Sequence, residues 1–118
     1  MTDFKTSIIA AIEEAVPELA EKIQCGAVDA ETTSPFATYC TPEEHPVRTK
    51  DGIAAIETLF EVAVFDSRVA NAETLKRKVS AALEGLRIGN KVCRHSSSSS
   101  EYYPDYDLHS WTLTFKVI

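Results

Sequence analysis

The chain has 118 residues, of which 44% are hydrophobic and 25% charged, the balance of an ordinary globular domain with one core. Its formal net charge is -6, and an acidic domain repels phosphate backbones, so the composition argues against specific nucleic-acid binding. The N-terminus lacks the pattern of a signal peptide, and no apolar run is as long as a membrane span. We therefore expect a cytoplasmic protein that makes no membrane contact.

The first segment, residues 3–22, is predicted to be helical. Phe4, Ile8 and Ile12 recur at the spacing of one helix face, and glutamates occupy the other side. Pro17 does not fit inside a helix, because it lacks the N–H donor and its ring clashes with the preceding turn. We expect a long helix followed by a short one with Pro17 in its first turn.

The middle of the chain is predicted to alternate between strands and loops. Residues 23–28 form a weak strand candidate, and the polar residues 29–35 are typical of a loop. Residues 36–40 predict a short strand that follows a proline. Residues 42–52 contain two prolines and several charges, which indicates a loop or an extended edge. Residues 53–65 alternate in character and are the clearest strand of the sequence.

A second helix is predicted over residues 72–84. Leu75, Val79 and Leu83 repeat every four residues and mark its buried face. Gly85 stands where a helix commonly ends in a left-handed residue, which glycine adopts without steric cost.

The last third of the chain is predicted to form a hairpin with a long connection. Residues 92–95 favour a short strand, and residues 96–100 are five consecutive serines, which indicate a mobile loop tip. Residues 101–107 continue that loop. Residues 108–118 alternate between apolar and polar side chains and predict the final strand.

Together these elements predict one α+β domain that spans residues 1–118. We expect a mixed or antiparallel sheet of about four to five strands, with two helices packed on one face, because both helices have a single apolar stripe to bury. The sequence shows no internal repeat and no domain boundary.

No residue pattern predicts a metal or cofactor. His45, His95 and His109 do not have the spacing of a zinc motif. Cys93 and His95 share a strand face, yet a zinc site needs four ligands, and the sequence nominates no others. Phosphate-binding glycine loops are absent from the sequence as well.

A cysteine–histidine pair is the strongest enzyme alternative. Cys40 with His45 or His109 could supply a nucleophile and a base. Nothing in the local sequence activates the thiol, since no helix begins after Cys40 and no cationic pair flanks it. The three cysteines are odd in number and lack CxxC spacing, so we interpret Cys25, Cys40 and Cys93 as reduced core residues and the chain as non-enzymatic.

Three stretches carry a resemblance to a known family. Residues 34–40 read SPFATYC, residues 46–52 read PVRTKDG, and residues 59–65 read LFEVAVF. A helix that ends near Gly85 and a closing pair of strands follow. This order resembles the small tail-completion proteins (tail-to-head joining proteins or tail terminators) of long-tailed phages and prophages, over residues 8–117.

The resemblance implies a structural role in virion assembly. Such proteins form a ring, often of six copies, that ends the tail tube and offers a surface to the head connector. The implied partners are further copies of the chain, the tail-tube protein and the head-connector protein, and no cofactor is implied. Assembly would take place in the cytoplasm of the bacterial host, and the product would be part of the virion tail.

Five side chains are predicted to contribute to the interfaces, because they lie in predicted loops and belong to types that interfaces favour. They are Arg48, Lys50, Tyr102, Tyr103 and Tyr106. Two alternatives stay open beside the cysteine enzyme. One is a generic adaptor domain that dimerises through an exposed sheet face, and the other is a nucleic-acid binder, which the charge disfavours.

Overall fold

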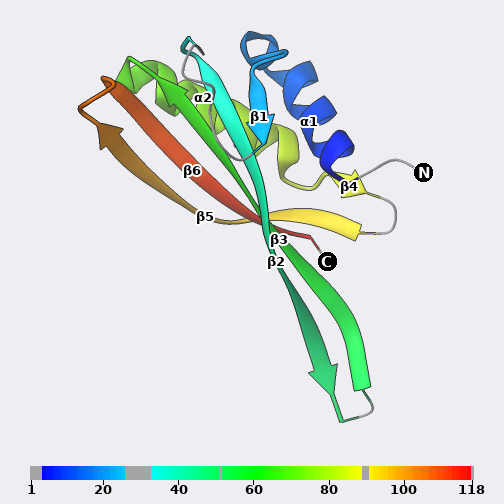
Figure 1. The fold of residues 1–118 in the computed structure, drawn as a ribbon. Coiled ribbons are helices and arrows are strands. Elements are labelled where there is room, and N and C mark those ends of the chain that lie inside the picture. The colour runs from blue at the N-terminus through cyan, green and yellow to red at the C-terminus, as the bar shows by residue number, and fades with distance from the viewer. Residues whose placement is uncertain (1–3, 26–32, 51, 89–90, 118) are drawn as a thin grey trace.

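The computed structural model describes residues 4–25, 33–50, 52–88 and 91–117; of residues 4, 5, 25, 41–49 and 53–57 it describes the backbone only. These parts form two α-helices, one 3-10 helix and a six-stranded sheet (Figure 1). The elements in chain order are α1 (Phe4–Ala15), η1 (Pro17–Leu19), β1 (Ile23–Cys25), β2 (Phe36–Thr49), β3 (Gly52–Asp66), α2 (Val69–Leu83), β4 (Arg87–Ile88), β5 (Lys91–Tyr103) and β6 (Leu108–Val117).

The strand order across the sheet is β1-β2-β3-β6-β5-β4. β1 runs parallel to β2, and every other neighbouring pair is antiparallel, so the sheet is mixed. The predicted α+β class is confirmed, but the expected count of four to five strands is too low. The additional strand is β4, two residues that pair with the start of β5 just after α2 ends.

Both helices contribute to a single hydrophobic core. α2 packs against β3 and β6 and contacts α1 on its other side. Alternation along the strands places Phe60, Val62 and Val64 of β3 and Leu113, Phe115 and Val117 of β6 in this layer. The rings of Phe60 and Phe115 stack with centroids 5.2 Å apart. The buried core includes Ile8, Ile12, Leu19, Tyr39, Phe60, Val62, Val64, Leu75, Val79, Leu83, Leu113, Phe115 and Val117.

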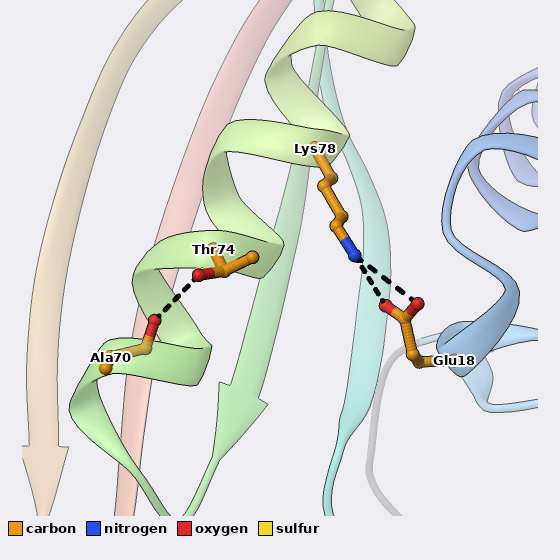
Figure 2. A network of polar contacts seen from close by, with 4 residues as sticks. All are labelled: Glu18, Ala70, Thr74 and Lys78. Carbon is orange, nitrogen blue, oxygen red and sulfur yellow. Dashed lines mark hydrogen bonds and ion pairs between the residues drawn. The ribbon is translucent and has the colours of Figure 1, made fainter.

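The break at Pro17 lies where the sequence predicts it. α1 ends at Ala15, and Pro17 begins η1, whose Leu19 is buried. The Nζ atom of Lys78 on α2 lies 3.4 Å from both carboxylate oxygens of Glu18 on η1 (Figure 2). Both side chains are partly exposed, so this ion pair stabilises the fold by about 1 kcal/mol at most. No helix in the described part of the chain has the length and apolar character needed to cross a membrane.

Residues 42–52, predicted to be a loop or an extended edge, are mostly strand. β2 continues to Thr49 and β3 begins at Gly52, and the two pair along their length with register shifts after Cys40 and after Val47. Pro46 pairs with Ile56. Proline has no N–H, and within a hairpin it is tolerated where the missing donor would face the outer edge.

The serine run is also strand, not the mobile loop tip that the sequence predicts. Ser97 to Ser100 pair with Thr114 to Trp111 of β6, and the register shifts once between His95 and Ser97. Serine has little strand propensity of its own, but the alternating partner strand β6 supplies the ladder. The connection between β5 and β6 is therefore only residues 104–107, shorter than expected.

Candidate assembly interface

The β2–β3 hairpin extends well beyond the rest of the sheet. β1 pairs with β2 only at residues 37–39, and β6 pairs with β3 only from Thr58 onward. We call the remainder of the hairpin, residues 43–50 and 52–57, the arm. It projects away from the helices in Figure 1 and accounts for much of the molecule's 51 Å length. In the described strand pairs, the two strands of the arm pair only with each other.

A hairpin of two strands alone is marginally stable in water, and its outer edges present free backbone groups. The two edges of the arm differ. The β2 edge includes Pro46, whose ring and missing donor hinder the addition of another strand. The β3 edge, residues 53–57, has no proline. The β3 side of the arm is thus the better acceptor for an extended segment.

Beyond β5 the sheet has only the two-residue strand β4, which pairs with the start of β5. The outer edge of β5 also has hydrogen-bond partners a little further along. Gly85 donates its N–H to the carbonyl of Cys93 at 2.8 Å, and Cys93 donates in turn to the carbonyl of Leu86. The carboxylate of Glu84 accepts the N–H of His95, and this bond lowers the pKa of Glu84, with Arg94 contributing from 3.4 Å. The end of α2 and the turn after it therefore protect β5 as far as His95.

Beyond Ser97, no described residue pairs with this side of β5. We call residues Ser98 to Tyr103 the free edge. All but the last of them are exposed. Natural edge strands are usually guarded by charged side chains, above all lysine, by proline or by a bulge. The bulge of β5 comes before this stretch, and the free edge has neither lysine nor proline; Glu101 is its one charged residue.

A hollow of about 240 Å³ adjoins the free edge on the side of α2. Val69 at the start of α2 and Tyr102 line it, with 57% and 48% of their surface exposed. Tyr102 packs on His109 with ring centroids 4.6 Å apart, and Trp111, another lining residue, holds the ammonium group of Lys76 4.3 Å above its ring. The hollow therefore has aromatic and aliphatic walls, and the acidic Glu73 and Glu101 line it as well. It lies beside a strand edge with which no described residue pairs.

The predicted interface residues gather in two places. Tyr102 and Tyr103 lie at the end of β5, and Tyr106, 76% exposed, lies in the turn that follows. Lys50 is exposed and follows the end of β2 at the tip of the arm. The arm and the β5–β6 turn lie at opposite ends of the molecule (Figure 1). The backbone of Arg48 lies in β2, but its side chain is outside the described part. The interface role of all five stays a prediction.

Carboxylates orient two of these tyrosines. The hydroxyl of Tyr102 donates to Asp107 at 3.0 Å, and that of Tyr103 donates to Glu101 at 2.7 Å. Each bond raises the pKa of its tyrosine, because the neutral hydroxyl is the donor. Both rings are thus held at the β5–β6 turn in a fixed direction.

The cysteines are placed differently from one another. Cys93 is buried, as predicted, and desolvation raises the pKa of its thiol to about 12, with the charge of Glu84 adding to the effect. Cys40 is exposed, so its interpretation as a core residue is wrong. Tyr39 takes the inward position on β2, and alternation leaves its neighbour on the opposite face. The side chain of Cys25 lies outside the described residues.

The structure separates the residues of the cysteine–histidine alternative. Cys40 pairs with Glu61 on the sheet face away from the helices. His109 lies on the helix face beside Tyr102, so these two groups do not meet. The side chain of His45 is outside the described part. His95 packs on Phe115, and within the described residues no cluster of three histidine, cysteine or acidic side chains could hold a metal ion.

A larger hollow of about 350 Å³ lies between η1 and the first turns of α2. Four of its polar side chains have partners within the fold. Lys78 pairs with Glu18, the Thr74 hydroxyl donates to the carbonyl of Ala70 at 3.0 Å (Figure 2), and Asp66 accepts the N–H of Arg68 at 2.9 Å. The Lys78–Glu18 pair joins η1 to α2, so we read this hollow as structural.

Comparison with known proteins finds a shared fold and no match in sequence. No protein-family model and no curated protein sequence matches the chain. A solved structure described as the virion of a native gene transfer agent particle contains a chain with the same fold. The TM-score is 0.68 at 15% identity, over 97% of this chain and 92% of that one.

A second solved structure, whose name describes no function, is similar over 99% of this chain and 97% of its own, with a TM-score of 0.52 at 15% identity. At such identities the likeness shows the fold. It spans nearly the whole of each chain, so the common feature is the complete architecture rather than a local motif.

Proposed function

We propose that this chain is a structural protein of a phage or prophage virion, which caps the tail tube and joins it to the head connector as a ring of identical subunits. The observation that carries the proposal is the likeness, over almost the full length, to a chain of a gene transfer agent virion. The tail-completion resemblance of residues 34–40 and 46–52 points the same way from the sequence. The role requires no catalysis.

The distribution of surfaces on the subunit supports a ring. A cyclic ring needs two different patches per subunit, which meet head to tail and close by rotation. The arm and the hollow beside the free edge are two such patches, and they lie on different strands. In this role Arg48 and Lys50 belong to the arm patch, and Tyr102, Tyr103 and Tyr106 to the other. The outer surfaces of the ring would meet the tail-tube protein and the head connector.

Deletion of the gene from the genome that encodes it tests this function. We expect induced cells to produce filled heads and separate tails, because the joint between them is missing. Electron microscopy of the lysate measures the fraction of joined particles, and expression of the intact gene from a plasmid should restore it. In the host, we expect the free protein in the cytoplasm before assembly.

Particles that stay joined and infectious without the gene would contradict the proposal. The adaptor alternative would then lead, and it makes a separate prediction: a symmetric dimer in solution rather than a ring. Genes for a tail-tube protein and a long helical tape-measure protein beside this gene would favour the tail function, whereas metabolic or signalling neighbours would favour the adaptor.

A further inference from the structure

The free edge of β5 and the β3 edge of the arm are complementary parts of one molecule. The first is the outer edge of residues 98–103, which pairs with no described residue. The hollow beside it is lined by Val69, Tyr102 and Trp111 together with the acidic Glu73 and Glu101. The second is a strand edge over residues 53–57, without proline, that continues past the last pair with β6 at Thr58. Each edge is about the length of a short natural strand, five to six residues.

We propose that the arm of one copy adds as a strand to the free edge of β5 in the next copy. In such strand addition, main-chain hydrogen bonds give the affinity and pockets for alternate side chains give the specificity. The hollow lined by Val69, Tyr102 and Trp111 is the pocket that would receive a side chain of the added strand. This inference rests on the proposed function only in naming the ring that the contact would build.

The sequence of the arm suits that pocket. Residues 53–57 read IAAIE, and its two isoleucines, Ile53 and Ile56, are three positions apart. Because side chains alternate along a strand, a strand of this sequence has one isoleucine on each face. Either direction of pairing therefore leaves one isoleucine position in register with the face of the sheet on which the hollow opens. The alanines between them allow close approach to the serines of the free edge.

The occupant is a second copy rather than the same one. Within a molecule, the arm projects away from the body, while the free edge lies toward the β5–β6 turn at the other end (Figure 1). Between molecules, a contact that joins β3 of one copy to β5 of the next is head to tail. Such contacts propagate and close into rings, whereas a pairing of β5 with β5 would give a two-fold dimer.

Disulfide trapping tests the contact directly. Paired residues of antiparallel strands have Cα atoms about 4.5–5.5 Å apart, which is within the range that a disulfide bridges. In a background with Cys25→Ser and Cys40→Ser, we would mix a Ser100→Cys protein with proteins that carry Ala54→Cys, Ala55→Cys or Ile56→Cys, and oxidise them at high concentration. The control is Lys116→Cys, exposed on β6 in the interior of the sheet.

We expect a mixed disulfide dimer between Ser100→Cys and at least one arm variant. The arm variants should form no such dimer with the control Lys116→Cys. A single protein that carries both cysteines should give covalent rings. A dominant Ser100→Cys homodimer would overturn the proposal in favour of edge-to-edge dimers. Absence of any mixed product, even at millimolar protein, would overturn it as well.

Two proline variants check that backbone pairing forms the contact. Along β5 successive N–H groups point alternately to β6 and outward, so only one of Ser99→Pro and Ser100→Pro breaks the ladder with β6. The proline variant that leaves this ladder intact should have the same Tm as the parent but should no longer form the mixed disulfide. In both proline variants the cysteine for trapping is Ser98→Cys in place of Ser100→Cys. If the folded proline variant still cross-links fully, the added strand is excluded. Both experiments test the contact between copies and not the role of the protein in the virion. A negative result would therefore overturn the strand addition without overturning the proposed function, and loss of the proposed function would not overturn the contact.

Discussion

The two halves of the β2–β3 hairpin share one ladder but differ in their surroundings. The half next to β1 and β6 buries Tyr39, Phe60 and Val62 in the core beneath the helices, and Phe36 stacks on Phe65. The other half, the arm, has no neighbouring strand in the described structure and no helix beside it (Figure 1). The difference indicates two tasks for one hairpin. Its inner half contributes to the folding of the body, and its outer half is available to another molecule.

The largest effect on stability is expected in the inner half. Phe60→Ala removes a ring that is fully buried and stacked on Phe115. The lost apolar burial and the cavity that is left should reduce the free energy of unfolding by about 3–5 kcal/mol. Urea denaturation followed by circular dichroism measures this loss. A loss below about 1 kcal/mol would show that the ring does not belong to the core as described.

A smaller effect is expected where α2 gives way to β5. Gly85 has φ +80°, a left-handed conformation, and a Cβ atom added there would meet nothing within 4 Å. Gly85→Ala should therefore lower the free energy of unfolding through backbone strain alone, by about 1–2 kcal/mol. Gly85→Asn is the matched control, since asparagine tolerates this region better. Equal stability of the two variants and the parent would contradict the assigned conformation.

Glu84→Gln tests the covered part of the β5 edge and gives a pH-dependent effect. The bond from His95 lowers the pKa of Glu84 below its ordinary 4.5 in the folded state, so below that pH the unfolded chain binds more protons. The stabilisation is present above pH 4.5 and lost as the pH falls through the folded pKa. The difference in Tm between parent and variant should be largest near neutral pH and shrink on acidification. A difference that stays constant with pH would exclude this carboxylate as its source.

The smallest effect on stability is expected from removing the arm. Replacement of residues 45–57 by an Asn-Gly turn joins the ends that pair as Glu44 and Thr58, and Asn-Gly is the preferred two-residue hairpin turn. The free energy of unfolding should change by less than about 1 kcal/mol, the range of surface changes away from a core, while assembly into rings is lost. A variant that unfolds would show that the arm supports the body, and one that still assembles would remove the arm from the interface.

The sequence predicts the body of this fold well because its signals are local. The helical spacing in α1, Pro17 at the start of η1, the fourfold repeat of α2 with Gly85 beyond it, and the alternation of β6 all arise from short-range physical chemistry. The exposure of Cys40 could also have been inferred, because its neighbour Tyr39 takes the inward position. These features need no knowledge of distant partners.

The arm and the free edge were missed because non-local pairing determines them. Pro46 is typical of a loop unless its missing donor faces the outer edge of a hairpin, which only the register with β3 reveals. The serine run forms a strand because β6 supplies the ladder. The tyrosines were predicted to lie in a loop, but Tyr102 and Tyr103 are in β5 and Tyr106 is in the turn that follows. The hollow beside Tyr102 needs Val69 from α2, and no spacing in the sequence brings these two together.

Immunogold electron microscopy of purified particles tests the central claim most directly. Antibodies raised against the purified protein would mark it in particles produced from the intact gene. We predict gold at one place in each particle, the junction between head and tail, and none along the tube. Gold distributed along the tail, or particles that contain none of the protein while the gene is expressed, would contradict the account.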